Sequence, residues 1–186
     1  TGNVLINGYN LAKEPVVCKL HTGHIPDRPF LYEKLTGDEF LKFIASLYNL
    51  SPETFERNVD RLLTLFDLTD WQDHLIESYS HGMRQKLIMT SVFMLETPTI
   101  IVDEPMIGLD PKSARIVKEL FKNHARTGGS IFLSTHSLEV AEELCDRIAI
   151  ILNGCIKTVG DMKSLRKEAS LETSDLEGVF LELTKA

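Results

Sequence analysis

The sequence has no long hydrophobic run, few cysteines and no excess of positive charge, and each absence excludes a class of protein. No apolar run approaches the ~18 residues that a membrane-spanning helix needs, and there is no signal peptide. The three cysteines are odd in number and scattered, which is typical of thiols in a reducing compartment and not of a disulfide scaffold. A net charge of −7 argues against a general binder of nucleic acid or anionic membranes. Composition therefore predicts a cytosolic protein.

Two catalytic motifs are also missing. The 186 residues contain no Gly-Lys dipeptide, and hence no G-x-x-x-x-G-K-[ST] phosphate loop. No G-x-S-x-G elbow is present, so an esterase has no support. What remains is a globular composition, 43% apolar and 25% charged, in a length that fits one domain or one domain with an insertion.

Short apolar runs at 100–102, 131–133 and 148–152 predict strands that are buried on both faces of a parallel sheet. Helical patterns lie between them. Asp110-Pro111 is a typical helix start, and Ser137 is suited to cap a further helix. Alternation of strands and helices predicts the α/β fold class with a mostly parallel sheet.

The stretch from about 36 to 95 shows helical periodicity and no convincing strand. Thr36 with Glu39 forms a capping box, and Ser51-Pro52 and Ser80 are suited to open two further helices. We expect an all-helical subdomain inserted into the α/β layer.

Two acids follow the apolar run in Thr99-Ile-Ile-Val-Asp-Glu-Pro105. A strand that ends in acids would place Asp103 and Glu104 at the carboxyl edge of a parallel sheet, where ligands usually bind. Because strand side chains alternate, one carboxylate could hold a metal ion while the other faces a reacting water. The alternative is a pair of solvated acids at a strand end.

Two further segments have the chemistry of a phosphate site. In Tyr79-Ser-His-Gly-Met-Arg-Gln85, a serine cap followed by glycine offers free backbone N–H groups and the positive end of a helix dipole. The alternative is an ordinary cap. His136 follows the predicted strand 131–133, and it is either a functional group at a strand end or a structural histidine.

Together these elements resemble one family. The segments Ser80-His-Gly-Met-Arg-Gln85, Asp103-Glu104, Gly108-Leu-Asp-Pro111 and His136 follow the order and spacing of ATP-binding-cassette (ABC) ATPases over essentially the whole chain. The resemblance implies a core like that of P-loop NTPases, with its N-terminal part missing, and an inserted all-helical subdomain.

The resemblance also implies site residues. Asp103 would be the Walker B aspartate that holds Mg²⁺, and Glu104 the base that polarises the attacking water. His136 would be the switch histidine near the γ-phosphate of ATP, and Asp110 would belong to the D-loop, which communicates across a dimer.

The signature motif of the family would include Ser80, His81, Gly82, Met83 and Gln85, and it would close on ATP bound by the opposite subunit. His81 stands where glycine is usual, a variant associated with exporter-like members.

Two other departures concern the nucleotide. Asp27 occupies the place of the Q-loop glutamine, from which it could reach Mg²⁺ through water. The phosphate loop of the family should lie upstream of Thr1, so the chain resembles the downstream part of a longer protein. We therefore expect the chain by itself to be inactive.

We predict four parts. They are residues 1–27, the remainder of the N-terminal core and antiparallel β region; 28–96, the helical subdomain ending in the signature helix; 97–160, the α/β core with Walker B, D-loop and switch histidine; and 161–186, a C-terminal helical tail. Val4 to Ile6, before Asn7-Gly8, predicts half of a β-hairpin.

The function implied is that of an ATP-binding and ATP-hydrolysing transporter subunit, for export, with ATP and Mg²⁺ as cofactors. Its partners would be a membrane-spanning permease on a separate chain and a second nucleotide-binding subunit in a homodimer, without nucleic acid. Its location would be cytoplasmic, peripheral on the inner face of the cell membrane. Alternatives are a soluble ABC ATPase that acts on ribosomes or DNA, and a non-hydrolysing regulatory module, which the intact Glu104 and His136 disfavour.

Overall fold

The computed structural model describes residues 2–28, 30–171 and 173–185. The chain divides into two compact units, residues 1–134 and 135–186. Within the described residues, no helix combines the length and the apolar character needed to cross a membrane.

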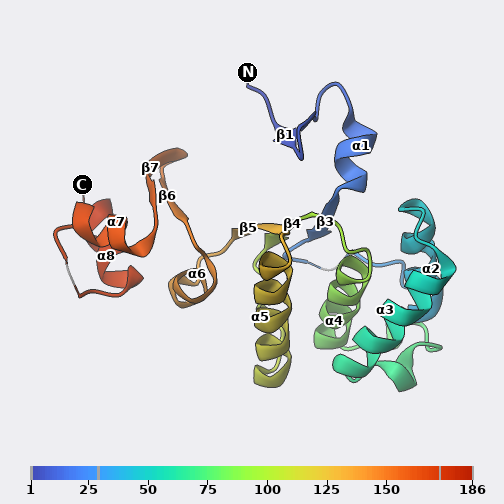
Figure 1. The fold of residues 1–186 in the computed structure, drawn as a ribbon. Coiled ribbons are helices and arrows are strands. Elements are labelled where there is room, and N and C mark those ends of the chain that lie inside the picture. Colours follow the sequence, from blue (N-terminus) through green and yellow to red (C-terminus); the bar gives the residue numbers. More distant parts are fainter. Residues whose placement is uncertain (1, 29, 172, 186) are drawn as a thin grey trace. The chain divides into compact units, whose positions relative to one another are not determined.

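A three-stranded parallel sheet forms the centre of the first unit (Figure 1). Its strands are β3 (Thr22–Ile25), β4 (Thr99–Asp103) and β5 (Ser130–Ser134), with β4 in the middle. The helix α5 (Pro111–Arg126) connects β4 to β5. In register, Ile25 lies opposite Val102 and Asp103 opposite Ser134, so all three strands end at the same edge. The predicted parallel pairing of the runs at 100–102 and 131–133 is confirmed. The predicted burial on both faces is wrong for the run at 131–133, because Phe132 of β5 is 71% exposed.

The first residues form the predicted hairpin. The strands β1 (Leu5–Ile6) and β2 (Tyr9–Asn10) pair antiparallel around Asn7-Gly8, both of which have positive φ angles. Such a two-residue turn matches the twist of the strands that it joins. A short helix, α1 (Pro15–Leu20), follows.

The stretch from 36 to 95 is helical, as predicted. Its elements are α2 (Gly37–Leu47), α3 (Pro52–Leu65), the 3-10 helices η1 (Thr69–Trp71) and η2 (Ile76–Ser78), and α4 (His81–Phe93). The Thr36–Glu39 capping box is complete, and the Ser51 side chain accepts the N–H of Thr54.

The helix α4 is the most buried helix of the first unit, because it packs against both the sheet and the helical part. Leu87 and Met89 are fully buried. A Cβ atom on Gly23 of β3 would lie 2.6 Å from Cγ1 of Val92, so glycine is what lets strand and helix approach.

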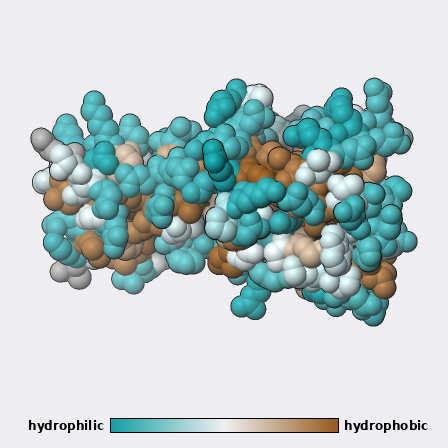
Figure 2. Space-filling model, turned by 90° about the horizontal axis from the view of Figure 1, so that it is seen from below, coloured by the Kyte–Doolittle hydropathy of each residue, from teal (hydrophilic) through white to brown (hydrophobic). Residues whose placement is uncertain are grey.

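The second unit contains α6 (Leu138–Leu144), β6 (Ile148–Leu152), β7 (Cys155–Gly160), α7 (Met162–Glu168) and α8 (Leu176–Thr184). Leu165, Ala169, Leu176 and Val179 form its core. Figure 2 shows hydrophobic surface on both units, broken by hydrophilic side chains.

The run at 148–152 forms a strand, but its predicted parallel pairing is wrong. β6 pairs antiparallel with β7. Asn153 and Gly154 both have positive φ angles and reverse the chain in a tight turn, so that β7 returns along β6. Ile150 is buried whereas Ile151 is 62% exposed, so the run is not buried on both faces.

Candidate functional site

The acidic pair marks the end of the central strand. Asp103 is the last residue of β4, and its carboxylate accepts a hydrogen bond from the hydroxyl of Ser134 on β5. The N–H of Glu104 donates to the carbonyl of Ser134 at 3.0 Å. Glu104 has a φ of 47°, a left-handed conformation that costs a non-glycine residue energy and that concentrates at functional sites. Two bonds to β5 hold this turn.

Asp27 lies at the same edge of the sheet, because it follows the end of β3 by two residues. Its carboxylate is half-buried, and its Oδ2 atom lies 3.9 Å from Nε of Arg28. The ends of β3 and β4 therefore bring Asp27, Asp103 and Glu104 to one side of the sheet.

These carboxylates suit a Mg²⁺ ion that is bound together with a nucleotide. No group of three or more His, Cys, Asp or Glu side chains in the described part of the chain could enclose a metal ion. Mg²⁺ is usually held by one or two carboxylates together with substrate phosphates and water, so an open site of this kind fits it.

The signature segment, Ser80–Gln85, begins the helix α4. The Ser80 side chain is exposed and accepts the N–H of Met83 at 3.3 Å. The predicted serine cap is confirmed. As in other helices, the remaining N–H groups of the first turn carry partial positive charge, which favours an anion.

The residue before the signature is anchored in the interior. Tyr79 is 5% exposed, and its hydroxyl donates to the carbonyl of Trp71 at 2.6 Å. Burial, together with the nearby Asp73, raises the pKa of Tyr79 to about 12. The phenol is therefore neutral, and stays a donor, throughout the physiological pH range.

The D-loop segment, Gly108–Pro111, packs directly on the signature of the same chain. A Cβ atom on Gly82 would lie 3.0 Å from the carbonyl oxygen of Gly108. A Cβ atom on Gly108 would lie 2.3 Å from Cδ2 of His81, and Gly108 has a φ of 77°. Glycine at both positions thus permits the backbone of the D-loop to approach Gly82 and the imidazole of His81 closely.

Asp110 adds a charged link between the D-loop and α4, directly after the signature. Its Oδ2 atom lies 3.3 Å from Nζ of Lys86, whose side chain is only 16% exposed. Asp110 also caps α5, because its carboxylate accepts the N–H of Ser113 at 2.9 Å and the hydroxyl of Ser113 at 2.6 Å. These bonds from Ser113, with a smaller contribution from Lys86, hold the pKa of Asp110 below its usual range.

Gln85 differs from the rest of the signature. It is fully buried, and as far as the structure describes the chain neither amide atom has a hydrogen-bond partner. Its side chain therefore lies behind the exposed surface of Ser80, and its role toward a nucleotide stays a prediction.

His136 lies in the second unit, in the connection between β5 and α6. The next residue, Ser137, caps α6 by accepting the N–H of Val140 at 3.4 Å, as predicted, and its own N–H donates to Oγ1 of Thr135. Whether His136 approaches the γ-phosphate stays a prediction.

Sequence reasoning missed three residues that support the site: Ser134, Lys86 and Ser113. Ser113 had a signal, since serine at the third helical position after an aspartate cap can share the cap. Ser134 and Lys86 had no such signal, because each contacts a residue that is distant in the sequence. Ser134 lies 31 residues from Asp103, and Lys86 lies 24 residues from Asp110.

Solved structures share this fold. One, entitled "Structure of ATP binding subunit of ABC transporter", superimposes with a TM-score of 0.96 and 37% identity over 100% of this chain and 77% of that chain. Another, entitled "Dimeric structure of a post-hydrolysis state of the ATP-binding cassette MJ0796 bound to ADP and Pi", has a TM-score of 0.75 and 20% identity, over 87% and 74% of the two chains. The fold class predicted from sequence, that of ABC ATPases, is confirmed.

Sequence comparison then gives the family. The family described as "AAA domain, putative AbiEii toxin, Type IV TA system" matches residues 5–142. The "ABC-type transporter ATP-binding protein EcsA" of Bacillus subtilis (strain 168) is 34% identical over 184 residues, which are 99% of this chain and 74% of EcsA. The chain belongs to the ATP-binding proteins of ABC transporters, ABC-type ATPases that couple ATP hydrolysis to transport.

Proposed function

We propose that the edge formed by β3 and β4 is where this subunit hydrolyses Mg-ATP. Asp103, held by the hydroxyl of Ser134, ligates the Mg²⁺ ion of the bound nucleotide. Glu104 accepts the proton of the attacking water, and His136 donates a hydrogen bond to the γ-phosphate. Phosphoryl transfer depends mainly on positioning and charge neutralisation, which these groups supply. The observation that carries the proposal is the left-handed turn at Glu104, tied to β5 directly after a strand that ends in Asp103.

Asp27 has a supporting role in this proposal. It stands at the Q-loop position and at the same sheet edge, from which it would reach Mg²⁺ through a water molecule.

The signature serves a second copy of the chain. Ser80 is exposed at the start of α4, and the D-loop packs on the signature through Gly82, Gly108 and His81. Beside these contacts Ser80 stays exposed, which supports a role toward another molecule. In the proposed homodimer, Ser80 and Met83 of one subunit close on ATP held by the acids of the other.

Mixing two inactive variants tests this composite site. In the complete gene product, we expect Ser80→Ala and Glu104→Gln each to lower steady-state ATP hydrolysis. A mixed dimer still contains one intact site, with Glu104 from the Ser80→Ala subunit and Ser80 from the other. Mixing the two purified proteins should therefore recover hydrolysis.

The control is the doubly substituted protein, Ser80→Ala with Glu104→Gln, mixed with each single variant, because neither pairing contains a site with both Ser80 and Glu104. The doubly substituted protein should recover nothing with either single variant. If the two single variants mixed remain as inactive as each alone, the signature does not act across a dimer.

We further propose that the subunit drives export through a membrane-spanning permease on a separate chain, at the cytoplasmic face of the cell membrane. His81 at the second signature position supports export, since this variant is associated with exporter-like members.

An exposed apolar surface of the first unit suits the permease. It consists of Phe30, Tyr32, Phe43 and Leu47, which are 90%, 56%, 39% and 54% exposed. The rings of Tyr32 and Phe43 meet edge to face with centroids 5.6 Å apart. This docking surface includes α2 and the loop after Asp27, so a bound permease would touch the loop that reaches the nucleotide.

Substitution of the docking surface tests this part. Tyr32→Ser and Phe43→Ser should abolish co-purification with a co-expressed membrane-spanning permease, whereas Leu181→Ser, which replaces an apolar residue 56% exposed in the second unit, should not. Unchanged co-purification of all three variants would contradict the assigned docking surface.

A further inference from the structure

The end of the loop that follows Asp27, residues 33–36, is paired with residues 75–77, which precede the signature. The N–H of Ile76 donates to the carbonyl of Leu35 at 2.9 Å, and the N–H of Glu77 to the carbonyl of Glu33 at 3.0 Å. Thr36 and Leu75 form an antiparallel bridge between these bonds and α2. Two stretches about forty residues apart thus form a short ribbon that ends three residues before Ser80.

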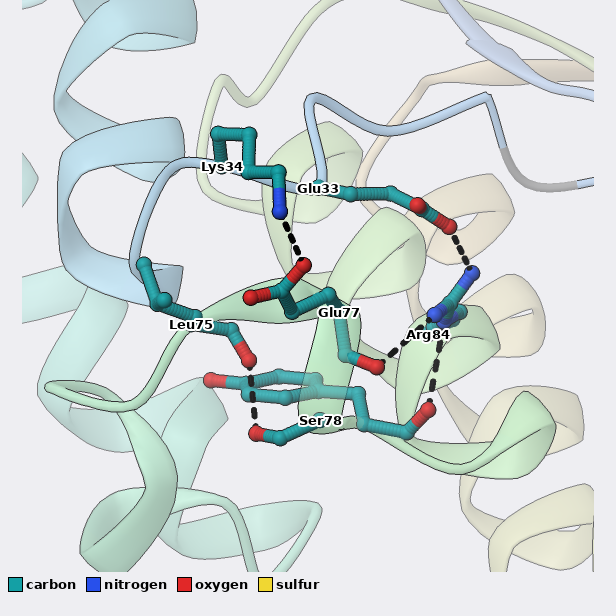
Figure 3. Close-up of polar contacts among 7 residues, drawn as sticks. Glu33, Lys34, Leu75, Glu77, Ser78 and Arg84 are labelled. Carbon is teal, nitrogen blue, oxygen red and sulfur yellow. Dashed lines mark hydrogen bonds and ion pairs between the residues drawn. The ribbon is translucent and has the colours of Figure 1, made fainter.

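Two ion pairs fasten the ribbon on the side of the signature (Figure 3). Nζ of Lys34 lies 2.5 Å from Oε2 of Glu77, and Nη1 of Arg84 lies 2.5 Å from Oε1 of Glu33. Two adjacent loop residues of opposite charge, Glu33 and Lys34, thus each pair with a residue of opposite charge near Ser80: Arg84 follows Ser80 in the chain and Glu77 precedes it. Each loop residue therefore holds one side of the signature segment.

Arg84 makes the more specific contacts. Besides the bond to Glu33, its Nε donates to the carbonyl of Tyr79 at 3.2 Å and its Nη2 to the carbonyl of Glu77 at 3.2 Å. Its backbone N–H donates to the carbonyl of Ser80 at 3.0 Å. Arg84 lies in the first turn of α4, and its guanidinium binds the backbone just before the cap residue Ser80. The planar guanidinium can do so because it presents several donors in a fixed geometry.

These contacts contribute little to stability by themselves. The side chains of Arg84 and Glu33 are 27% and 53% exposed, and exposed ion pairs add only a small free energy. Their effect is instead on position, because the carbonyls that Arg84 binds belong to the residues that set the direction of Ser80.

We propose that Arg84 and Glu33 are positioning residues for ATP hydrolysis, which hold Ser80 in register with the loop that follows Asp27. The ribbon and the Arg84 guanidinium tie the start of α4 to residues 33–36 of this loop. The inference rests on the proposed role of Ser80 at the nucleotide of a second subunit, and it adds the residues that couple Ser80 to the Asp27 loop.

Kinetics of the complete gene product test the coupling. We expect Glu33→Ala and Arg84→Ala each to lower kcat per folded molecule by about fivefold or more, with KM for ATP within about twofold, because orientation of Ser80 is lost while the nucleotide is still bound. The double variant should be no slower than Arg84→Ala, since both substitutions break the same link. Arg84→Lys keeps the charge opposite Glu33 but lacks the fork, so its kcat should lie between those of Arg84→Ala and wild type.

The matched control is Glu182→Ala, which also removes an exposed carboxylate paired with one cation, Lys185, but lies in the second unit. Its kcat should equal that of wild type. Glu33→Gln guards against misfolding, because it removes only the charge of a half-exposed side chain, and it should lower kcat in the same direction as Glu33→Ala.

Two results would overturn the proposal. One is a kcat for Glu33→Ala and Arg84→Ala within twofold of wild type; the other is a double variant whose loss is the product of the single losses. Ser80→Ala, measured alongside, distinguishes failure of the proposed coupling from failure of the composite site. If Ser80→Ala lowers kcat and the Arg84 variants do not, only the coupling fails; if Ser80→Ala has no effect, the role of Ser80 fails first.

Discussion

At the scale of single residues, unusual backbone conformations gather directly after the central strand. Glu104 and Gly108 both have positive φ angles, and they bound the turn that leads from Asp103 to the D-loop. Sequence predicts glycine at such a position but gives no signal for a left-handed glutamate, which hydrogen bonds to β5 hold in place. The residue types of the site were therefore predictable, whereas the geometry of this turn was not.

His136→Ala should lower turnover by a factor on the order of 10² or more, the usual effect of removing one aligned transition-state donor. The melting temperature should stay nearly unchanged. ATPase assays and thermal unfolding of the complete gene product measure the two effects. A large loss of stability with activity preserved per folded molecule would mean that the histidine is structural.

Asp27→Gln should be tolerated, because it places the usual residue of the family at the Q-loop position, half-buried at the sheet edge. We expect ATPase activity to be retained and its coupling to transport to change modestly. Assays with and without the membrane partner measure both. Complete loss of hydrolysis would instead show that the carboxylate of Asp27 has a dedicated catalytic role.

At the scale of elements, local signals predicted most of the first unit. The caps at Thr36, Ser51, Ser80 and Asp110 all form, because each needs only a backbone N–H two or three residues away. Pairing between segments that are distant in the sequence was harder to predict. An apolar run indicates a strand but not its neighbour, which is why the partner of β6 was mispredicted and the ribbon of 33–36 with 75–77 was not anticipated.

The close approach of β3 and α4 gives a stability prediction. Gly23→Ala would place a Cβ 2.6 Å from Cγ1 of Val92, so it should destabilise the protein by about 1–3 kcal/mol, the usual cost of overpacking a core. Denaturant unfolding measures this loss. Val92→Ala removes the obstructing methyl groups, so the double variant should lose less than the sum of the single losses. Strictly additive losses would contradict the assigned contact.

At the scale of the whole molecule, the family assignment and the geometry of the first unit support one account. The acids lie at the end of β4 and the signature at the start of α4. In the proposed homodimer, the signature of one subunit closes on ATP held by the acids of the other. The four-part division at residues 27/28, 96/97 and 160/161 stays a prediction. The order of the motifs was sufficient to identify the family, because the motifs occur at fixed spacing. Spacing alone does not predict which segments contact one another.

The most direct test of the central claim is Glu104→Gln in the complete gene product. An amide cannot accept the proton of the attacking water, so turnover should be abolished while ATP binding is kept. Because hydrolysis no longer separates the subunits, ATP and Mg²⁺ should convert the variant into a stable dimer, seen as a doubled mass in light scattering, whereas wild type returns to monomer. Steady-state hydrolysis within about threefold of wild type, with no ATP-dependent dimer, would contradict the account, because removal of a general base costs far more than that.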